Sequence, residues 1–440
     1  MAIVGIYMAN IQKYFEAFND QIKTGYNYNS ELKDKRDTLL SNLRDSLDVS
    51  FDNFNQGSYG MGTGVKPEDG DFDIDVALVF KESDNEKFDS PFELKKDIYH
   101  ALEHTHRTVK IKRPCVTVKY SSSGKDKYHV DFAIYRKDKE GNLYFARGKS
   151  KDEAEWEDAD PQGLVNKIKN RFSNNSEKEQ YKRCIRALKR WKATKLNHKN
   201  LPSIAITVAA YLAFEPKFYD SEKEQPNDVE ALICFIDKLD DYISNKNLML
   251  PVKPHGNLLC NLTDSQTQEL RSKLKRLKDD LLATKDINIR VVDACKKMKK
   301  HFGKDFPIPE GVSLSTEQFI EDMFVLSKKL SPLSISLEIS QYGSLIYSVI
   351  SRFDRELKII PKGRTLTFKI DNVKDFTGCD FYWKVLNIGE EAEKRGIRGQ
   401  IEKGSFFHKE HSDFSGEHYV ECYVIQDGIC IARETIDVPI

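Results

Sequence analysis

The sequence has no excess of charge of either sign. Its 440 residues include 69 lysines and arginines and 69 aspartates and glutamates, so the formal net charge at pH 7 is zero. Proteins that bind long nucleic acids or anionic membranes usually carry a basic excess, which this chain lacks. Stable nucleic-acid binding is therefore not expected, and any nucleotide site must rely on a local cluster of positive charge.

Long apolar runs and paired cysteine motifs are also lacking. The opening segment MAIVGIYMANI is apolar, but it falls far short of the ~20 residues that a membrane-spanning helix needs and shows no signal-peptide pattern. The eight cysteines are scattered, and none forms a CxxC pair. Such cysteines are typical of reduced thiols. We expect a cytoplasmic protein without membrane contact.

What the chain does have is enough apolar sequence for two or three folded domains. Apolar residues at helical spacing predict helices over 9–23, 30–49 and 91–104, and alternating residues predict strands over 72–78, 115–120 and 127–137. The polar stretch 145–161 is expected to be a loop. The pattern is then mostly helical to about residue 300 and alternates again from 365 to 440. This predicts an α+β protein with domains at 1–161, 162–305 and 306–440.

Acidic residues on two predicted strands carry the chemistry. Asp73 and Asp75 are two residues apart and therefore share one strand face, while Phe72, Ile74 and Val76 point into the core. Asp131 lies on the later strand in the segment YHVDFAIY. If the two strands are neighbours, three carboxylates converge, and a divalent cation is the usual partner of such a cluster. The simpler interpretation of a DxD pair alone is two solvated acids.

A glycine-rich segment precedes the first acidic strand. Gln56, Gly57 and Ser58 begin a stretch with further glycines at 60, 62 and 64. Backbone N–H groups and a serine hydroxyl in such a turn can bind phosphate oxygens. A glycine-rich turn is more often structural, but its position before DxD and a third strand acid favours a triphosphate site.

These residues resemble a known family. The segments GSYGMGTGVKP, DFDIDVALVF and HVDFAIY are similar to the polymerase-β-type nucleotidyltransferases, and among them to the cGAS/DncV-like nucleotidyltransferases (CD-NTases) of bacterial CBASS anti-phage signalling. The spacer between Ser58 and Asp73 is slightly long. The resemblance implies a core with a mixed sheet and a helical second lobe that completes the active-site cleft. It also implies Asp73, Asp75 and Asp131 as catalytic, metal-binding residues.

The resemblance implies an activity as well. The enzyme would hold two Mg²⁺ ions, or Mn²⁺, per active site and join nucleoside triphosphates into a cyclic di- or trinucleotide with release of pyrophosphate. ATP and GTP are the expected substrates, with pyrimidine nucleotides as further candidates, and the product would act on a downstream effector. Gln56, Gly57 and Ser58 would bind the donor triphosphate.

Matches continue along the chain. The segment EWEDADP, with Trp156 and Asp160-Pro161, resembles the segment that follows the third acid in the family. Lys189 matches a lysine that contacts the triphosphate, although a solvated helix face explains it equally well. Ser203 matches a serine that contacts the nucleotide, with a simple helix N-cap as the alternative. Residues from about 306 resemble the adenylyl/guanylyl and SMODS C-terminal sensor (AGS-C) domain.

Other interpretations remain at this stage. The same acids serve transferases that make linear oligonucleotides or add tails to RNA, and a protein with this fold can also be a non-catalytic nucleotide sensor. His100, His104 and His106 have spacing compatible with a metal, but no cysteine lies nearby, so an exposed helix face is the preferred interpretation.

Overall fold

The computed structural model describes residues 10–440, except 25, 69, 82–89, 121–126, 197–200, 287, 310–316, 328, 343, 351–358, 389–390 and 393–397. The chain forms two compact units. The central unit comprises Asn19–Lys189 and Pro202–Asn261, and the C-terminal unit comprises Met1–Phe18, Arg190–Leu201 and Leu262–Ile440. The division at residues 161/162 and 305/306 stays a prediction.

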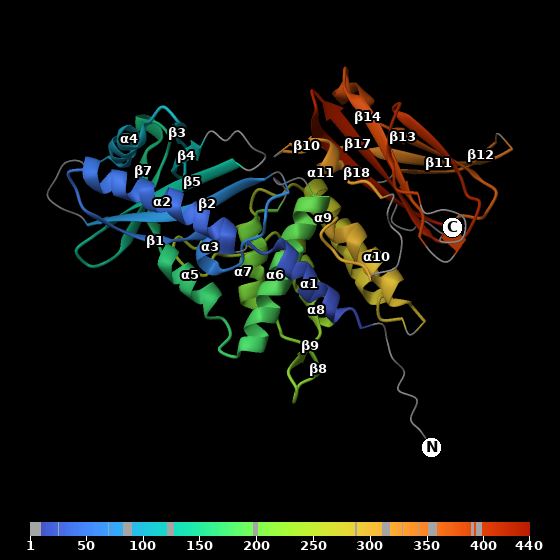
Figure 1. Ribbon diagram of the computed structural model, residues 1–440, viewed down its shortest axis with the longest axis horizontal. Helices are drawn as coiled ribbons and strands as arrows, with labels where there is room; N and C mark the ends of the chain where they lie inside the picture. Colours follow the sequence, from blue (N-terminus) through green and yellow to red (C-terminus); the bar gives the residue numbers. More distant parts are fainter. Residues whose placement is uncertain are drawn as a thin grey trace. The chain divides into compact units, whose positions relative to one another are not determined.

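A seven-stranded sheet organises the central unit (Figure 1). Its main order is β1-β2-β5-β4-β3, and β6 pairs with both β5 and β7. Only β2 and β5 run parallel; the other pairs are antiparallel, which makes the sheet mixed as expected. The strands are β1 (Phe51–Asn55), β2 (Asp71–Lys81), β3 (Arg107–Ile111), β4 (Val116–Tyr120), β5 (Lys127–Lys137), β6 (Leu143–Arg147) and β7 (Glu155–Ala159).

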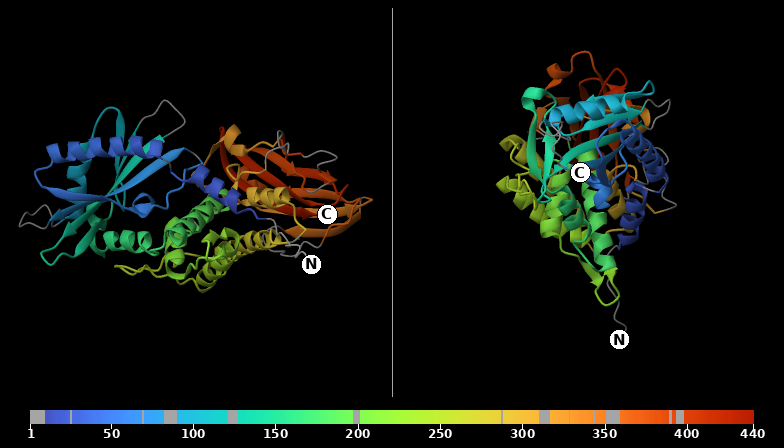
Figure 2. Two further views of the ribbon diagram at one scale, coloured as in Figure 1. Left: turned by 60° about the horizontal axis from the view of Figure 1, so that its bottom comes forward. Right: turned by 90° about the vertical axis from the view of Figure 1, so that its left-hand side faces the viewer.

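Two helices cover one face of this sheet, α2 (Tyr26–Ser46) and α4 (Pro91–Leu102). Leu39, Leu43 and Ile98 from these helices pack against alternate residues of β2 and β5, including Ile74 and Val130, in one buried core. Figure 2 shows α2, in blue, running along the sheet. The period-two alternation of the strands therefore turns the intervening residues, including the acids, to the opposite face.

The start of α4 shows how local sequence positions an element. Ser90 is the N-cap and accepts a hydrogen bond from the Glu93 backbone N–H at 3.4 Å, and Pro91 occupies the first turn, where its missing N–H costs nothing. The predicted helices over 9–23, 30–49 and 91–104 correspond to α1 (Gln12–Ile22), α2 and α4.

The expectation of a loop over 145–161 is wrong. This stretch contains part of β6, the 3₁₀ turn η2 (Lys151–Glu153) and β7. The remaining elements with residues in this unit are α3 (Gly57–Met61), α5 (Pro161–Lys169), α6 (Asn175–Lys195), α7 (Ser203–Ala213), β8 (Phe218–Asp220), β9 (Gln225–Pro226) and α8 (Asp228–Asn245). The last six residues of α6 belong to the C-terminal unit.

The C-terminal unit combines helices with two sheets. Its main helices are α9 (Asp264–Ala283) and α10 (Val291–Phe302), followed by the short α11 (Ile320–Met323). One sheet has the order β10-β18-β17-β14-β15 and the other β12-β11-β13-β16. The strands are β10 (Val325–Leu326), β11 (Ile335–Gln341), β12 (Ser344–Ile350), β13 (Thr365–Ile370), β14 (Asp380–Leu386), β15 (Ile401–Gly404), β16 (Phe407–His411), β17 (Glu417–Gln426) and β18 (Ile429–Pro439), with the 3₁₀ turn η3 (Val373–Phe376) between β13 and β14.

One buried core joins these two sheets. Leu337 and Phe368 from one sheet pack with Trp383, Val424 and Ile436 from the other. The C-terminal all-β region and the α+β class are thus confirmed. All eight cysteines are free thiols. Within the described part of the chain, no helix has both the length and the apolar character needed to cross a membrane.

Candidate active site

The three predicted acids lie on neighbouring parallel strands. In the pairing of β2 with β5, Asp75 lies directly opposite Asp131, and Asp73 lies opposite His129. Asp73 and Asp75 share one face of β2, because side chains alternate along a strand. The structure therefore brings Asp73, Asp75 and Asp131 together on the sheet face opposite α2 and α4.

Gly57 begins α3 directly against Asp75. Its φ is +59°, and a Cβ atom at this position would lie 1.9 Å from Asp75 Oδ2, so only glycine allows this approach. The Gln56 backbone N–H donates to Asp75 O at 3.0 Å, and Tyr135 Oη donates to Gln56 Oε1 at 3.0 Å. Ser58 follows in the first turn of α3. The sequence segment Gln56-Gly57-Ser58 is thus fixed beside the acids.

The acids perturb one another's protonation. Burial, and then repulsion from Asp73 and Asp131, raise the pKa of Asp75 to about 7. Loss of hydration is also the largest cause of the raised pKa of Asp73; there the nearby His129 acts in the opposite direction. Because carboxylates with raised pKa values are relieved by added positive charge, this face favours a bound cation or a proton near neutral pH.

Asp131 has two partners that sequence reasoning missed. Thr117 on β4 pairs with Asp131 across the sheet, and its Oγ1 donates to Asp131 Oδ1 at 2.5 Å. Lys112 places its Nζ 3.7 Å from Asp131 Oδ2. No pattern around Lys112 or Thr117 marks them in the sequence, because Thr117 meets the acid through the pairing of β4 with β5 and Lys112 reaches it from the connection between β3 and β4.

The three carboxylates are neighbours, but their side chains are not arranged as a preformed metal-binding site. In the part of the chain that the structure describes, no group of three or more His, Cys, Asp or Glu side chains is gathered closely enough to hold an ion. Asp131 is instead directed at Thr117 and Lys112. The oxygen-only donor set nevertheless matches the preference of hard divalent cations.

Lys189 contacts the end of the glycine-rich segment. Its buried Nζ donates to Thr63 O at 3.2 Å and to Thr63 Oγ1 at 3.0 Å. Arg186, one turn earlier on α6, donates through Nη2 to Gly62 O at 2.7 Å. The two side chains therefore fasten residues 62–63, and a direct contact of Lys189 with triphosphate remains a prediction. Sequence reasoning did not single out Arg186 for this role.

Ser203 occupies the first turn of α7 and is exposed. The N-cap of this helix is Pro202, without a capping side chain, so the alternative of Ser203 as the N-cap is wrong. Ile204, the next residue, packs against a small core that contains Met61 of α3 and Val165 of α5. This packing joins the start of α7 to the helix that carries Ser58. Contact of Ser203 with nucleotide stays a prediction.

The segment EWEDADP has structural roles. Trp156 lies on β7, with the Arg136 guanidinium 5.2 Å from its ring centre. Asp160 is the N-cap of α5, and its Oδ1 accepts from the Gly163 N–H at 2.8 Å. His100 lies at the exposed end of α4, 3.0 Å from Glu103, as expected. His104 and His106 are exposed too, but they follow α4 in the turn before β3, so the expected helix face is wrong for these two.

Two regions of the chain match known protein families. Residues 52–135 match the family "Cyclic GMP-AMP synthase DncV-like, nucleotidyltransferase domain", and residues 314–440 match the "Adenylyl/Guanylyl and SMODS C-terminal sensor domain". A protein of Escherichia albertii named "Cyclic GMP-AMP synthase" is 26% identical over 429 residues, covering 92% of this chain and 88% of its own length.

Solved structures share the fold. The Vibrio cholerae DncV cyclic AMP-GMP synthase superposes with a TM-score of 0.55 and 16% identity over 68% of this chain and 97% of its own. The Bradyrhizobium diazoefficiens CD-NTase CdnG, in complex with GTP, superposes with a TM-score of 0.50 and 14% identity. This match covers 66% of this chain and 94% of CdnG. The three strand acids beside Gly57 and Ser58 lie within the matched nucleotidyltransferase region. The chain therefore has a nucleotidyltransferase domain of the cGAS/DncV-like type and a C-terminal adenylyl/guanylyl and SMODS sensor domain.

Proposed function

We propose that this enzyme uses divalent metal ions to synthesise a cyclic di- or trinucleotide from nucleoside triphosphates, with release of pyrophosphate, as a signal in anti-phage defence. The observation that carries the proposal is the register of Asp73, Asp75 and Asp131 on β2 and β5, with Gly57 against Asp75. The similarity to a named cyclic GMP-AMP synthase along 92% of the chain supports the cyclic product.

The chemistry of the acids fits Mg²⁺ or Mn²⁺, in two ions per site. Asp73 and Asp75 would hold both ions and Asp131 one of them. Such ions, when bound, activate an attacking hydroxyl and neutralise a leaving pyrophosphate. The raised pKa of Asp75 supports this assignment, because a cation would relieve the repulsion that raises it.

The chain's own residues would orient the substrates. Gln56, Gly57 and Ser58 would bind the donor triphosphate through backbone N–H groups and the Ser58 hydroxyl. Lys189 and Ser203 would contact it from α6 and α7. The acceptor hydroxyl oxygen forms a bond to the α-phosphorus, and the bond from that phosphorus to the bridging oxygen breaks. Its electron pair leaves with pyrophosphate, and the hydroxyl proton passes to solvent. A second reaction within the linear intermediate closes the ring.

ATP and GTP are the proposed substrates. Solved relatives are described as complexes with ATP and GTP or with GTP, and pyrimidine triphosphates remain candidates. The product would act on a separate effector, and no stable nucleic-acid partner is proposed. A cytoplasmic location is consistent with eight free cysteines.

The test is incubation of the purified protein with all four labelled triphosphates and Mg²⁺ or Mn²⁺, beside an Asp73→Ala/Asp75→Ala variant. A phosphatase-resistant product from the wild type alone supports cyclic synthesis. A phosphatase-sensitive product would favour the linear or RNA-tailing alternative. Nucleotide binding without any product, under every metal condition, would favour the non-catalytic sensor.

A further inference from the structure

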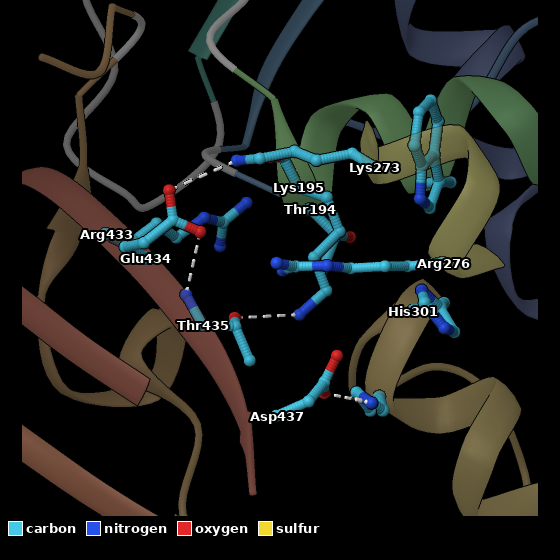
Figure 3. A pocket seen from close by; sticks show the side chains of 11 residues that line it. Thr194, Lys195, Lys273, Arg276, His301, Arg433, Glu434, Thr435 and Asp437 are labelled. Carbon is cyan, nitrogen blue, oxygen red and sulfur yellow. Dashed lines mark hydrogen bonds and ion pairs between the residues drawn. The ribbon is translucent and has the colours of Figure 1, made fainter. Parts of the chain in front are cut away.

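The C-terminal unit contains a pocket that the proposed reaction does not use. It is lined by residues from the end of α6, from α9, from α10 and from β18, and the cavity has a volume of about 40 Å³ that water can enter. Its lining is Trp191, Thr194, Lys195, Lys273, Arg276, Lys300, His301, Arg433, Glu434, Thr435 and Asp437. Figure 3 shows the Lys195 and Lys273 side chains reaching toward Thr435 and Glu434 of β18.

Positive charge dominates this lining. Five lysine and arginine side chains face two carboxylates, Glu434 and Asp437. Lys273 lies 3.4 Å from Glu434, and Lys300 contacts Asp437. Lys195 instead donates to the neutral Thr435 hydroxyl at 3.2 Å. The lining itself thus has more cations than acids, in a chain whose total charge is zero, and Lys273 and Lys300 also pair with Glu269 and Asp280 outside it.

Further acids contact the lining residues from outside the pocket. Glu421 is 3.4 Å from Lys195, Asp280 is 2.6 Å from His301 Nε2, and Glu321 is 3.0 Å from Arg433. These outer carboxylates hold the cationic side chains in place. At Lys195 they do not fully compensate for the loss of hydration. Burial lowers the pKa of this lysine, and the opposing effect of Glu421 is smaller. An anion in the pocket would supply the missing compensation.

Two buried polar atoms of the lining also lack a hydrogen bond within the part of the chain that the structure describes. Trp191 Nε1 and His301 Nδ1 are buried and make no hydrogen bond to any residue that the structure describes. Buried polar groups are nearly always paired, and their exceptions mark water, ions or ligands. Burial lowers the pKa of His301, so its Nε2–H donates to Asp280 and the neutral ring presents Nδ1 to the pocket as an acceptor, which suits water or a protonated phosphate oxygen.

We propose that this pocket binds the phosphate group of a small molecule. Phosphate carries up to two charges and several acceptor oxygens, which match a guanidinium, clustered ammonium groups and an indole N–H better than a single carboxylate does. The donors come from three helices and one strand, so they are held by the fold before the ligand arrives. The phosphate would belong either to an inorganic anion or to a nucleotide.

The experiment measures binding of inorganic phosphate, pyrophosphate and AMP to the full chain by calorimetry, in EDTA so that no metal-nucleotide complex forms. We expect binding to weaken at least about tenfold in Lys273→Met/Arg276→Gln, since each change removes a charged donor. Lys275→Gln, an exposed change on the same helix, is the matched control and should bind as the wild type does. Binding of all three probes assigns a phosphate group in general, and binding of pyrophosphate or phosphate alone assigns an inorganic anion.

A second measurement avoids variants altogether. Acetylation of wild-type lysines is followed by mass spectrometry with and without the probe that binds most tightly. Protection of Lys195, Lys273 and Lys300, with Lys275 unchanged, is the expected result. Absence of binding, equal affinity in the double variant and wild type, or protection that spares these three lysines would each overturn the proposal.

Discussion

Removing the charge of Asp75 should stabilise the metal-free protein at alkaline pH. The pKa of this group is raised from 3.8 to about 7 in the folded state, so folding disfavours its ionised form. One pKa unit corresponds to about 1.4 kcal/mol, so the folded state loses at most about 4 kcal/mol above pH 7. At pH 4, where the folded carboxyl is protonated, the loss is only about 0.5 kcal/mol.

The sign follows from linkage. The folded state binds this proton more tightly than the unfolded state does, so stability falls as pH rises from 3.8 through 7. Asp75→Asn cannot ionise and escapes this loss. The measurement is the free energy of unfolding in urea, in EDTA, for the variant and the wild type. We expect the variant's advantage over wild type to be about 2–4 kcal/mol larger at pH 8 than at pH 4. Because the chain has two units, the transition followed must be that of the central unit.

Two controls make the result specific. Asp52→Asn changes an exposed acid on the neighbouring strand β1 and should show no such pH dependence. Added Mn²⁺ should stabilise the wild type and not Asp75→Asn, because the carboxylate is a proposed ligand. Equal stability of Asp75→Asn and wild type at both pH values would refute the argument that crowded carboxylates strain this sheet face.

Three further results follow from the same site. Mn²⁺ affinity of the wild type, measured by electron paramagnetic resonance, should fall up to about tenfold per pH unit below 7, since the ion must displace the Asp75 proton; a flat profile would contradict the shifted pKa. Gly57→Ala should reduce kcat at least about 100-fold and destabilise the protein by about 1–3 kcal/mol, because its Cβ would strike Asp75. At Gly256 a Cβ would meet open space, so Gly256→Ala should behave as wild type in the same turnover and unfolding assays. Thr117→Val should weaken Mn²⁺ binding about 10–100-fold by releasing Asp131, and Thr117→Ser should restore it; unchanged affinity in both variants would remove Thr117 from the site.

Local sequence was sufficient for the acids because their geometry depends on one strand at a time. Alternation in DFDIDVALVF turns Asp73 and Asp75 to one face whatever lies beyond, and residues 72–76 of β2 alternate between buried and more exposed in the structure. The pairing of β2 with β5 then confirmed the expectation that Asp131 lies beside them. The apolar core positions Ile74 and Val130 were predictable for the same reason.

Local sequence was insufficient where contacts cross the sheet. Thr117 reaches Asp131 because β4 pairs with β5 in one register, and Lys112 reaches it from the connection between β3 and β4. The strand β7, with the sequence EWEDA, lacks apolar alternation and is mostly half-buried, so its polar composition suggested a loop. Lys189 was chosen from its motif, but its contact with Thr63 depends on the tertiary position of the glycine-rich segment.

The parallel pairing of β2 and β5 also limits how this sequence can change over time. Eleven consecutive residue pairs, from Asp71 with Lys127 to Lys81 with Lys137, set the position of every acid. Losing one residue before Asp73 within β2 would turn both acids into the core and their apolar neighbours into water. Losing two would restore the faces but move Asp75 away from Asp131. Insertions and deletions should therefore accumulate in the connections between these strands, while the strands themselves change only by substitution.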